Sequence, residues 1–226
     1  MKNIALILAS GSGSRCGLDY PKQFVEIDGK TILELSIDVF EHNSLIDEII
    51  IVTNLDYISK VKAMTDKYSK VSKVVAGGET RRESSCNGIF SINEDEANIL
   101  IHDAARPLVT DKIITDCVLG LNEYKSVCTA INSTDTIFLV DGEENITDIP
   151  KRTYCRRAQT PQCFKLSLIK EAHNCAKTDL NCSVTDDCGL ILEYTKEKIH
   201  IIKGDEDNIK VTYKDDINFV ITRLRK

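Results

Sequence analysis

The sequence predicts an α/β fold with a doubly wound, mainly parallel sheet. Short apolar runs alternate with segments of helical period along most of the chain, which is typical of βαβ units. These runs are almost continuously apolar, as expected for strands that helices cover on both faces. The 226 residues fit one large domain, and no linker or change of composition marks a boundary. We therefore expect a single domain over residues 1–226.

Apolar runs predict the strands of this sheet at residues 4–9, 48–53, 73–76, 99–102 and 127–131. Apolar residues three or four places apart predict helices between them, at residues 32–40, 57–68 and 113–121. After Pro161, the pattern predicts helices over 166–176 and 185–194, strands over 199–203 and 209–213, and a terminal helix.

One segment interrupts this alternation. Residues 135–140 and 145–149 are strand-like and flank the polar turn Asp141-Gly142-Glu143-Glu144, with no helical segment between them. This pattern predicts a β-hairpin. We expect the hairpin to project as an arm at about residues 133–157.

The composition limits the classes of function. Hydrophobic residues make up 42% and charged residues 28%, so a buried core is expected and disordered or coiled-coil classes are excluded. The formal net charge of −6 argues against nucleic-acid binding, which needs a basic excess. The 9 cysteines show no CxxC spacing, and no signal peptide or apolar run of about 18 residues is visible. We expect a protein of the reducing cytoplasm, without disulfides, structural zinc or a membrane span.

A loop rich in small residues follows the first strand and reads Ala9-Ser10-Gly11-Ser12-Gly13-Ser14-Arg15, with Pro21-Lys22-Gln23 shortly after it. Small residues let backbone N–H groups approach a phosphate, and this loop falls at the carboxyl edge where open α/β sheets bind ligands. A flexible turn with solvated charges is the alternative interpretation.

Two better known nucleotide loops fit this segment poorly. A dinucleotide fingerprint needs Gly where Cys16 stands and an acidic residue where Asn54 stands. A Walker A loop ending at Gly29-Lys30-Thr31 needs Gly where Phe24 stands, so that tripeptide fits a hairpin turn better.

Two further motifs fall at the same sheet edge. The fourth strand ends in His102-Asp103-Ala104-Ala105-Arg106-Pro107, where Asp103 can hold Mg²⁺ against phosphates. The alternative is that Asp103 caps a turn while Arg106 is solvated. Gly77-Gly78 precedes a helix, where backbone groups and Ser84 suit a base or ribose, with ordinary helix capping as the alternative. We expect His102 to be a hydrogen-bonded strand-end residue and not a ligand.

Together with Gln159-Thr160-Pro161-Gln162 and Asn208-Ile209-Lys210-Val211-Thr212, these motifs resemble one family, the polyol-phosphate cytidylyltransferases. The family comprises the 2-C-methyl-D-erythritol 4-phosphate and ribitol-5-phosphate enzymes, and the match is collinear over nearly the whole chain. The resemblance implies a Rossmann-like nucleotidyltransferase fold and transfer of cytidylyl from CTP to a polyol phosphate, with release of pyrophosphate. It also implies Mg²⁺ as the cofactor and a homodimer built by the arms.

The resemblance assigns roles to individual residues. The catalytic positions, which would hold the triphosphate and the developing charge, match Arg15, Lys22 and Lys210, and the metal position matches Asp103. The nucleotide-binding positions match Ala9, Ser10, Gly11, Gly13, Gly78, Ser84 and Ala104. The polyol-phosphate positions match Arg106, Thr136, Arg152 and Thr185, of which Thr136 and Arg152 would come from the partner's arm. These cations suit the reaction, because the attacking phosphate is already ionised and needs charge neutralisation rather than a general base.

The chain departs from the family pattern in ways that bear on the acceptor. Ser10 stands where a small apolar residue or Gly is usual, a change that its small size should make tolerable. Arg152 is followed by Thr153-Tyr154 rather than the Leu-Trp usual in erythritol-type enzymes, and Asp148-Ile149-Pro150 resembles the ribitol-type branch. We therefore expect ribitol 5-phosphate, a cell-wall polyol phosphate. The close alternative is methylerythritol phosphate of isoprenoid biosynthesis. A catalytically silent nucleotide-binding module is a third interpretation, weakened because every cationic position of the motif is filled.

Overall fold

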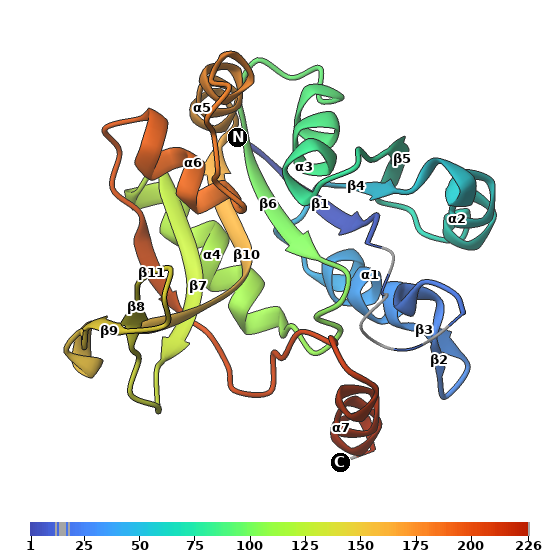
Figure 1. The fold of residues 1–226 in the computed structure, drawn as a ribbon. Helices are drawn as coiled ribbons and strands as arrows, with labels where there is room; N and C mark the ends of the chain where they lie inside the picture. Colours follow the sequence, from blue (N-terminus) through green and yellow to red (C-terminus); the bar gives the residue numbers. More distant parts are fainter. Residues whose placement is uncertain (12, 14–16, 18, 226) are drawn as a thin grey trace.

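A seven-stranded sheet forms the centre of the structure (Figure 1). The structure is a computed structural model that describes residues 1–11, 13, 17 and 19–225. The strand order is β11-β7-β10-β6-β1-β4-β5, and all neighbouring pairs are parallel except the two formed by β10. This confirms the doubly wound, mainly parallel sheet. Its strands are β1 (Lys2–Ala9), β4 (Glu48–Thr53), β5 (Val71–Ala76), β6 (Ala97–Asp103), β7 (Ser126–Asn132), β10 (Arg156–Lys165) and β11 (His200–Lys203).

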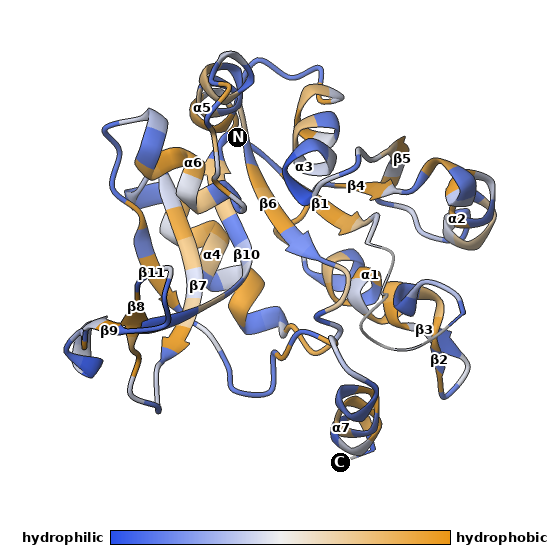
Figure 2. Ribbon diagram, in the orientation of Figure 1, coloured by the Kyte–Doolittle hydropathy of each residue, from blue (hydrophilic) through white to orange (hydrophobic). Residues whose placement is uncertain are grey.

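Helices cover both faces of the sheet, and the apolar strands run between them (Figure 2). Along β1, Ala5 and Ile7 pack with α1, α2 and α4, whereas Ile4 and Leu6 pack with α3, α5 and α6. Because both faces of the central strands are buried, these strands carry apolar residues at most positions, which explains their nearly continuous runs. The helices are α1 (Ile32–His42), α2 (Ile58–Thr65), α3 (Arg81–Phe90), α4 (Asp111–Glu123), α5 (Leu166–Thr178), α6 (Asp187–Tyr194) and α7 (Lys214–Leu224).

Two hairpins stand apart from the main sheet. The pair β2 (Glu26–Ile27) and β3 (Lys30–Thr31) closes through Asp28 and Gly29, whose φ angles of 50° and 83° are positive, which confirms the predicted turn. The pair β8 (Leu139–Val140) and β9 (Ile146–Asp148) is antiparallel and forms the predicted arm, with shorter strands than the sequence suggests.

The prediction of a strand over 209–213 is wrong. These residues form a loop that leads into α7, and the Val211 N–H donates a hydrogen bond to the carbonyl of Ala105 (2.8 Å). Val211 is fully buried in a small cluster with Val220 of α7 and Ile32 of α1. Its apolar character therefore reflects packing beneath α7 and not a place in the sheet.

Strand β10 is the element that the sequence pattern missed. It lies between β6 and β7 in the sheet although it contains Pro161, a residue that argues against a central strand. A shift of register between Ala158 and Gln162 accommodates the proline.

Helix α3 begins with a capping box that fixes its first turn at the edge of the sheet. The Thr80 hydroxyl accepts a hydrogen bond from the Glu83 N–H, and the Glu83 carboxylate accepts one from the Thr80 N–H, both at 3.1 Å. The capping interpretation of this motif is thus correct for Thr80 and Glu83, and it leaves Arg81 free to point along the edge.

Within the described ranges, no helix combines the length and the apolar character that crossing a membrane requires.

Candidate active site

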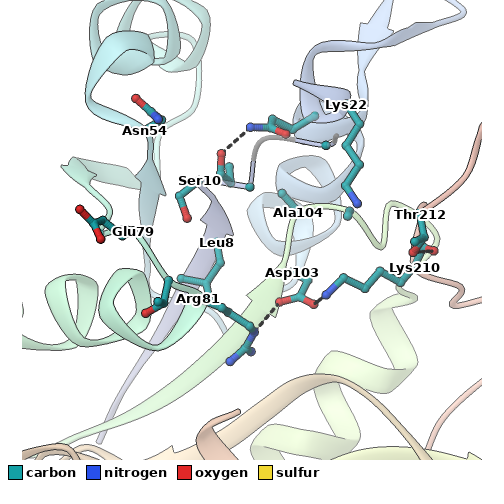
Figure 3. A pocket seen from close by; sticks show the side chains of 17 residues that line it. Leu8, Ser10, Lys22, Asn54, Glu79, Arg81, Asp103, Ala104, Lys210 and Thr212 are labelled. Carbon is teal, nitrogen blue, oxygen red and sulfur yellow. Dashed lines mark hydrogen bonds and ion pairs between the residues drawn. The ribbon is translucent and has the colours of Figure 1, made fainter. Parts of the chain in front are cut away.

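A cavity of about 430 Å³ opens where β1 and β6 end, at the carboxyl edge of the sheet (Figure 3). Open α/β sheets bind ligands at this edge because loops of successive parallel strands meet there. Three loops and two lysines form most of its wall. They contribute Ala9, Ser10, Gly11 and Gly13, then Gly78, Glu79, Thr80 and Arg81, then Asp103, Ala104 and Ala105, and finally Lys22 and Lys210.

The sequence-predicted residue Ser84 holds the wall of this cavity from behind. Its side chain is fully buried, accepts a hydrogen bond from the Gly78 N–H (3.1 Å) and pairs with the Ser10 hydroxyl (2.7 Å). A Cβ on Gly77 would lie 2.7 Å from the Ser84 Oγ, so the loop needs glycine there. Ser84 therefore fixes the loops after β1 and β5 relative to each other, and Gly78 presents the surface that a base would meet.

Lys22 lies in the short 3-10 helix η2 (Lys22–Phe24), directly after Pro21. Its side chain is buried, and Nζ donates a hydrogen bond to the Val211 carbonyl (2.5 Å). The neighbouring Gln23 amide donates to the Ala9 carbonyl (2.6 Å), which ties η2 to the end of β1. The sequence assigned no role to Gln23, because nothing local indicates this contact.

Gly13 is held against Lys22. Its φ of +71° lies in the left-handed region, and an added Cβ would meet the Lys22 backbone nitrogen at 2.9 Å. Arg15, predicted from the same loop, lies outside the described residues.

Replacing Gly13 with alanine should lower activity more than it lowers stability, because the methyl group would displace Lys22 from the cavity wall. We expect kcat/KM to fall about tenfold or more, since small misplacements of positioned groups are costly. Gly142→Ala is the comparison, because Gly142 lies in the exposed turn of the arm, outside this cavity, and its Cβ would enter open space. Steady-state kinetics and melting temperatures of both variants measure the difference. Equal losses in the two variants would contradict the proposed role of Gly13.

Asp103 is the centre of the charges in the cavity. One carboxylate oxygen accepts a hydrogen bond from Lys210 Nζ (2.7 Å) and the other accepts one from Arg81 Nε (3.2 Å). Burial alone would raise the pKa of Asp103, but the charges of Arg81 and Lys210 hold it well below its ordinary value. Asp103 is thus a buried, paired carboxylate and not simply a turn cap. Arg81 is a site residue that the sequence motif contained but to which no role was assigned.

A second cavity of about 390 Å³ adjoins the first and shares Arg81, Asp103 and Lys210 with it. The predicted acceptor residues Arg106 and Thr185 both line this second cavity. The Arg106 guanidinium donates to the carbonyls of Asn208 (2.8 Å) and Ala158 (3.4 Å). Carbonyl groups orient the guanidinium without neutralising it, so its positive charge is available to an anion. The structure therefore provides two adjoining pockets with a shared charged wall.

His102 supports this wall from the core and is not among the described residues that line either cavity. It is fully buried, with Nδ1 3.0 Å from the Thr160 hydroxyl and Nε2 3.2 Å from the Arg106 carbonyl. Burial lowers the pKa of His102 to about 4, so the ring is neutral near pH 7. The expectation of a hydrogen-bonded strand-end histidine is confirmed.

Thr136 and Arg152 are the predicted residues that the structure does not bring into either cavity of this chain. Both are exposed on the arm, and the Arg152 guanidinium donates to the Thr134 carbonyl (3.3 Å). That they act on another subunit stays a prediction.

Comparisons with known proteins give consistent results. The family model described as 2-C-methyl-D-erythritol 4-phosphate cytidylyltransferase matches residues 3–225. The enzyme of that name from Thermobifida fusca is 39% identical over 98% of this chain and 92% of its own length. The bifunctional ribulose 5-phosphate reductase/CDP-ribitol pyrophosphorylase of Haemophilus influenzae is 39% identical over 99% of this chain, which spans 48% of that protein. The crystal structure of 4-diphosphocytidyl-2C-methyl-D-erythritol synthase from Anaerococcus prevotii superposes with a TM-score of 0.89, at 30% identity over 100% of this chain and 96% of that one.

Proposed function

Because the chain belongs to the 2-C-methyl-D-erythritol 4-phosphate cytidylyltransferase family, whose members are CTP-dependent nucleotidyltransferases, we propose that it transfers cytidylyl from CTP to 2-C-methyl-D-erythritol 4-phosphate. The products would be a CDP-polyol and pyrophosphate. The observation that carries the proposal is the shared wall of Arg81, Asp103 and Lys210 between two cavities. A nucleotide in the first cavity and a polyol phosphate in the second would meet at this wall.

The chemistry follows from the charges at the wall. An oxygen of the acceptor phosphate forms a bond to the α-phosphorus of CTP, and the bond from that phosphorus to the bridging oxygen breaks as pyrophosphate leaves. The attacking oxygen is already ionised near neutral pH, so no side chain has to remove a proton. Two polyanions must nevertheless approach each other. Lys22 and Lys210 can neutralise the triphosphate, while Arg106 can neutralise the acceptor phosphate.

Ribitol 5-phosphate is a second candidate acceptor. Asp148-Ile149-Pro150 in the arm and Tyr154 in place of tryptophan favour it, as does the similarity to the bifunctional protein named for CDP-ribitol. The matched family model and the Thermobifida relative favour methylerythritol phosphate instead. The preference for ribitol 5-phosphate stays a prediction.

Pyrophosphate release from CTP with each polyol phosphate tests both candidates. We expect CTP to be used at least about tenfold better than ATP or GTP. If Gly78 and Ser84 shape the first cavity for a pyrimidine, as the matched positions imply, a purine would need more room, and a base-edge mismatch costs a few kcal/mol. Glycerol 3-phosphate serves as the control acceptor. Comparable kcat/KM for ATP would contradict the proposed nucleotide, and turnover of ribitol 5-phosphate alone would decide against methylerythritol phosphate.

The site fits a magnesium ion held mainly by phosphates. Magnesium commonly takes one or two protein carboxylates and completes its shell with phosphate oxygens and water. Asp103 provides such a carboxylate at the wall where the triphosphate would lie. When bound there, the ion would add positive charge at the phosphates.

Replacing Asp103 with asparagine should raise the Mg²⁺ concentration needed for half-maximal activity by about 10- to 100-fold, as is usual when a group that tunes a metal site is lost. Because Asp103 is buried and paired, we also expect a measurable loss of thermal stability. Activity over a magnesium series and calorimetry of Mg²⁺–CTP binding are the measurements. Full activity of the wild-type enzyme in excess EDTA would contradict a magnesium requirement.

We also propose a homodimer formed through the arm. Phe138, Leu139, Ile146 and Ile149 of the arm are 49 to 55% exposed, and Tyr154 at its base is 80% exposed. A two-stranded hairpin is marginal alone in water, so these apolar side chains need a covering surface.

A further inference from the structure

We propose that Asp187 is a positioning residue that keeps Asp103 shared between Arg81 and Lys210. It thereby sets the geometry of the wall between the first cavity, proposed for the nucleotide, and the second cavity, proposed for the acceptor and called the acceptor cavity below. Among the described residues that line either cavity, Asp187 does not appear, and the sequence motifs do not include it. Its link to the site runs through Arg81, which lines both cavities.

The contacts of Arg81 define this link. Its Nε donates to Asp103 (3.2 Å), while its Nη1 donates to an oxygen of Asp187 (2.7 Å). A single guanidinium is thus divided between two buried carboxylates, one at the reacting edge and one behind it. Because the guanidinium is planar and rigid, fixing one side of the fork fixes the direction of the other.

Asp187 itself is held from two other helices. Its second oxygen accepts hydrogen bonds from the Ser85 hydroxyl of α3 (2.6 Å) and from the His173 ring of α5 (3.2 Å). Burial would raise the pKa of Asp187, but His173 and Arg81 lower it, so the carboxylate is charged at neutral pH. It is the first residue of α6, directly after Thr185 and Asp186 of the acceptor cavity.

Loss of the Asp187 charge would change how Arg81 binds. Without that partner, Arg81 could turn a second N–H to Asp103 and form a bidentate pair, which competes with Lys210 for the same carboxylate. The wall would also become more positive by one charge, which favours binding of the CTP polyanion. Ground-state CTP affinity should therefore be preserved while the arrangement of Asp103 and Lys210 for transfer is lost.

The test compares Asp187→Asn with Asp187→Glu. We expect Asp187→Asn to lower kcat by about 10- to 100-fold, with a change of less than about threefold in the calorimetric Kd for CTP, a size typical of groups behind a site. Asp187→Glu keeps the charge and should recover most of kcat. Ile191→Val is the matched control, because it trims a fully buried apolar side chain of the same helix and touches no charge.

Two results would overturn the proposal. The first is that the kcat of Asp187→Asn lies within twofold of the kcat of Ile191→Val, with comparable melting temperatures. The second is that the kcat of Asp187→Glu is as low as that of Asp187→Asn. If Asp187→Asn does not fold, Arg81→Lys carries the test, because a lysine retains the charge but cannot bridge both carboxylates. It should show the same loss of kcat with preserved CTP affinity, and an unchanged kcat would contradict the role.

The proposal rests on the proposed transfer reaction, so a readout that needs no acceptor is included. The ¹⁵N signal of the Arg81 Nε–H, assigned with Arg81→Lys, should shift in Asp187→Asn and not in Ile191→Val. If the wild-type enzyme converts neither polyol phosphate, the proposed acceptors fail while this signal still decides the role of Asp187. An unshifted signal in Asp187→Asn overturns that role.

Discussion

Replacing Lys22 or Lys210 with alanine should lower kcat by at least about 100-fold, the size of loss found when one donor to developing transition-state charge is removed. The two lysines, which come from distant parts of the chain, both line the first cavity. Lys22 is held by the Val211 carbonyl and Lys210 by Asp103, so each ammonium group is fixed before substrate arrives. Fixed cations need no reorganisation when charge develops on the phosphates, and their loss should therefore appear mainly in kcat.

The two lysines should differ in their effect on stability. Lys22 is buried, and its removal leaves the Val211 carbonyl without this donor, whereas the Lys210 side chain is 38% exposed. Lys22→Gln separates the two effects, because an amide can still donate to a carbonyl but carries no charge. Lys112→Ala, at an exposed pair on α4, is the control. Wild-type turnover in both Lys22→Gln and Lys210→Ala would show that these charges do not serve transfer.

The sequence predicted which loops meet at the site because that outcome follows from topology. Loops after parallel strands share one edge, so the residues after β1 and β6 had to lie at the same edge once the order of strand and helix was recognised. Asp103, Ala104 and Gly78 lie in the cavity wall for this reason. The sequence pattern does not fix the strand order, which makes β1 and β6 neighbours.

Contacts between distant segments could not be predicted in the same way. Lys22 and Val211 are 189 positions apart, and Arg81 and Asp187 are 106 apart, so no local pattern joins either pair. The loop over 209–213 illustrates the same limit, since burial beneath α7 and burial in a strand give the same apolar residues. The motif placed Ser84 near the loop after β5, but its contact with Ser10, 74 positions away, has no local signal.

Replacing Arg152 with alanine should raise KM for the polyol phosphate by about 10- to 100-fold, the range expected when a hydrogen-bonded ionic contact is lost. The Kd for CTP should be almost unchanged, because an arm residue from another subunit would contact the acceptor alone. Lys151→Ala is the matched control, since it removes a neighbouring exposed charge at the same place on the arm. Equal changes in KM for the two variants would indicate a general loss of positive charge.

Mixing Arg152→Ala with Lys22→Ala chains tests whether the arm crosses between subunits. If it crosses, a mixed dimer contains one site with Lys22 from one chain and Arg152 from the other, both wild-type. The assay uses a polyol phosphate concentration well below KM, where the raised KM of Arg152→Ala sites makes them nearly inactive. Random exchange makes about half of the dimers mixed, each with one intact site of two, so about one quarter of the wild-type activity should return. Differently tagged chains verify that exchange has occurred. Verified mixed dimers without recovered activity would place Arg152 in the site of its own subunit. A monomer by sedimentation would exclude the arm-mediated dimer, because each chain would then have to supply every residue of its own site.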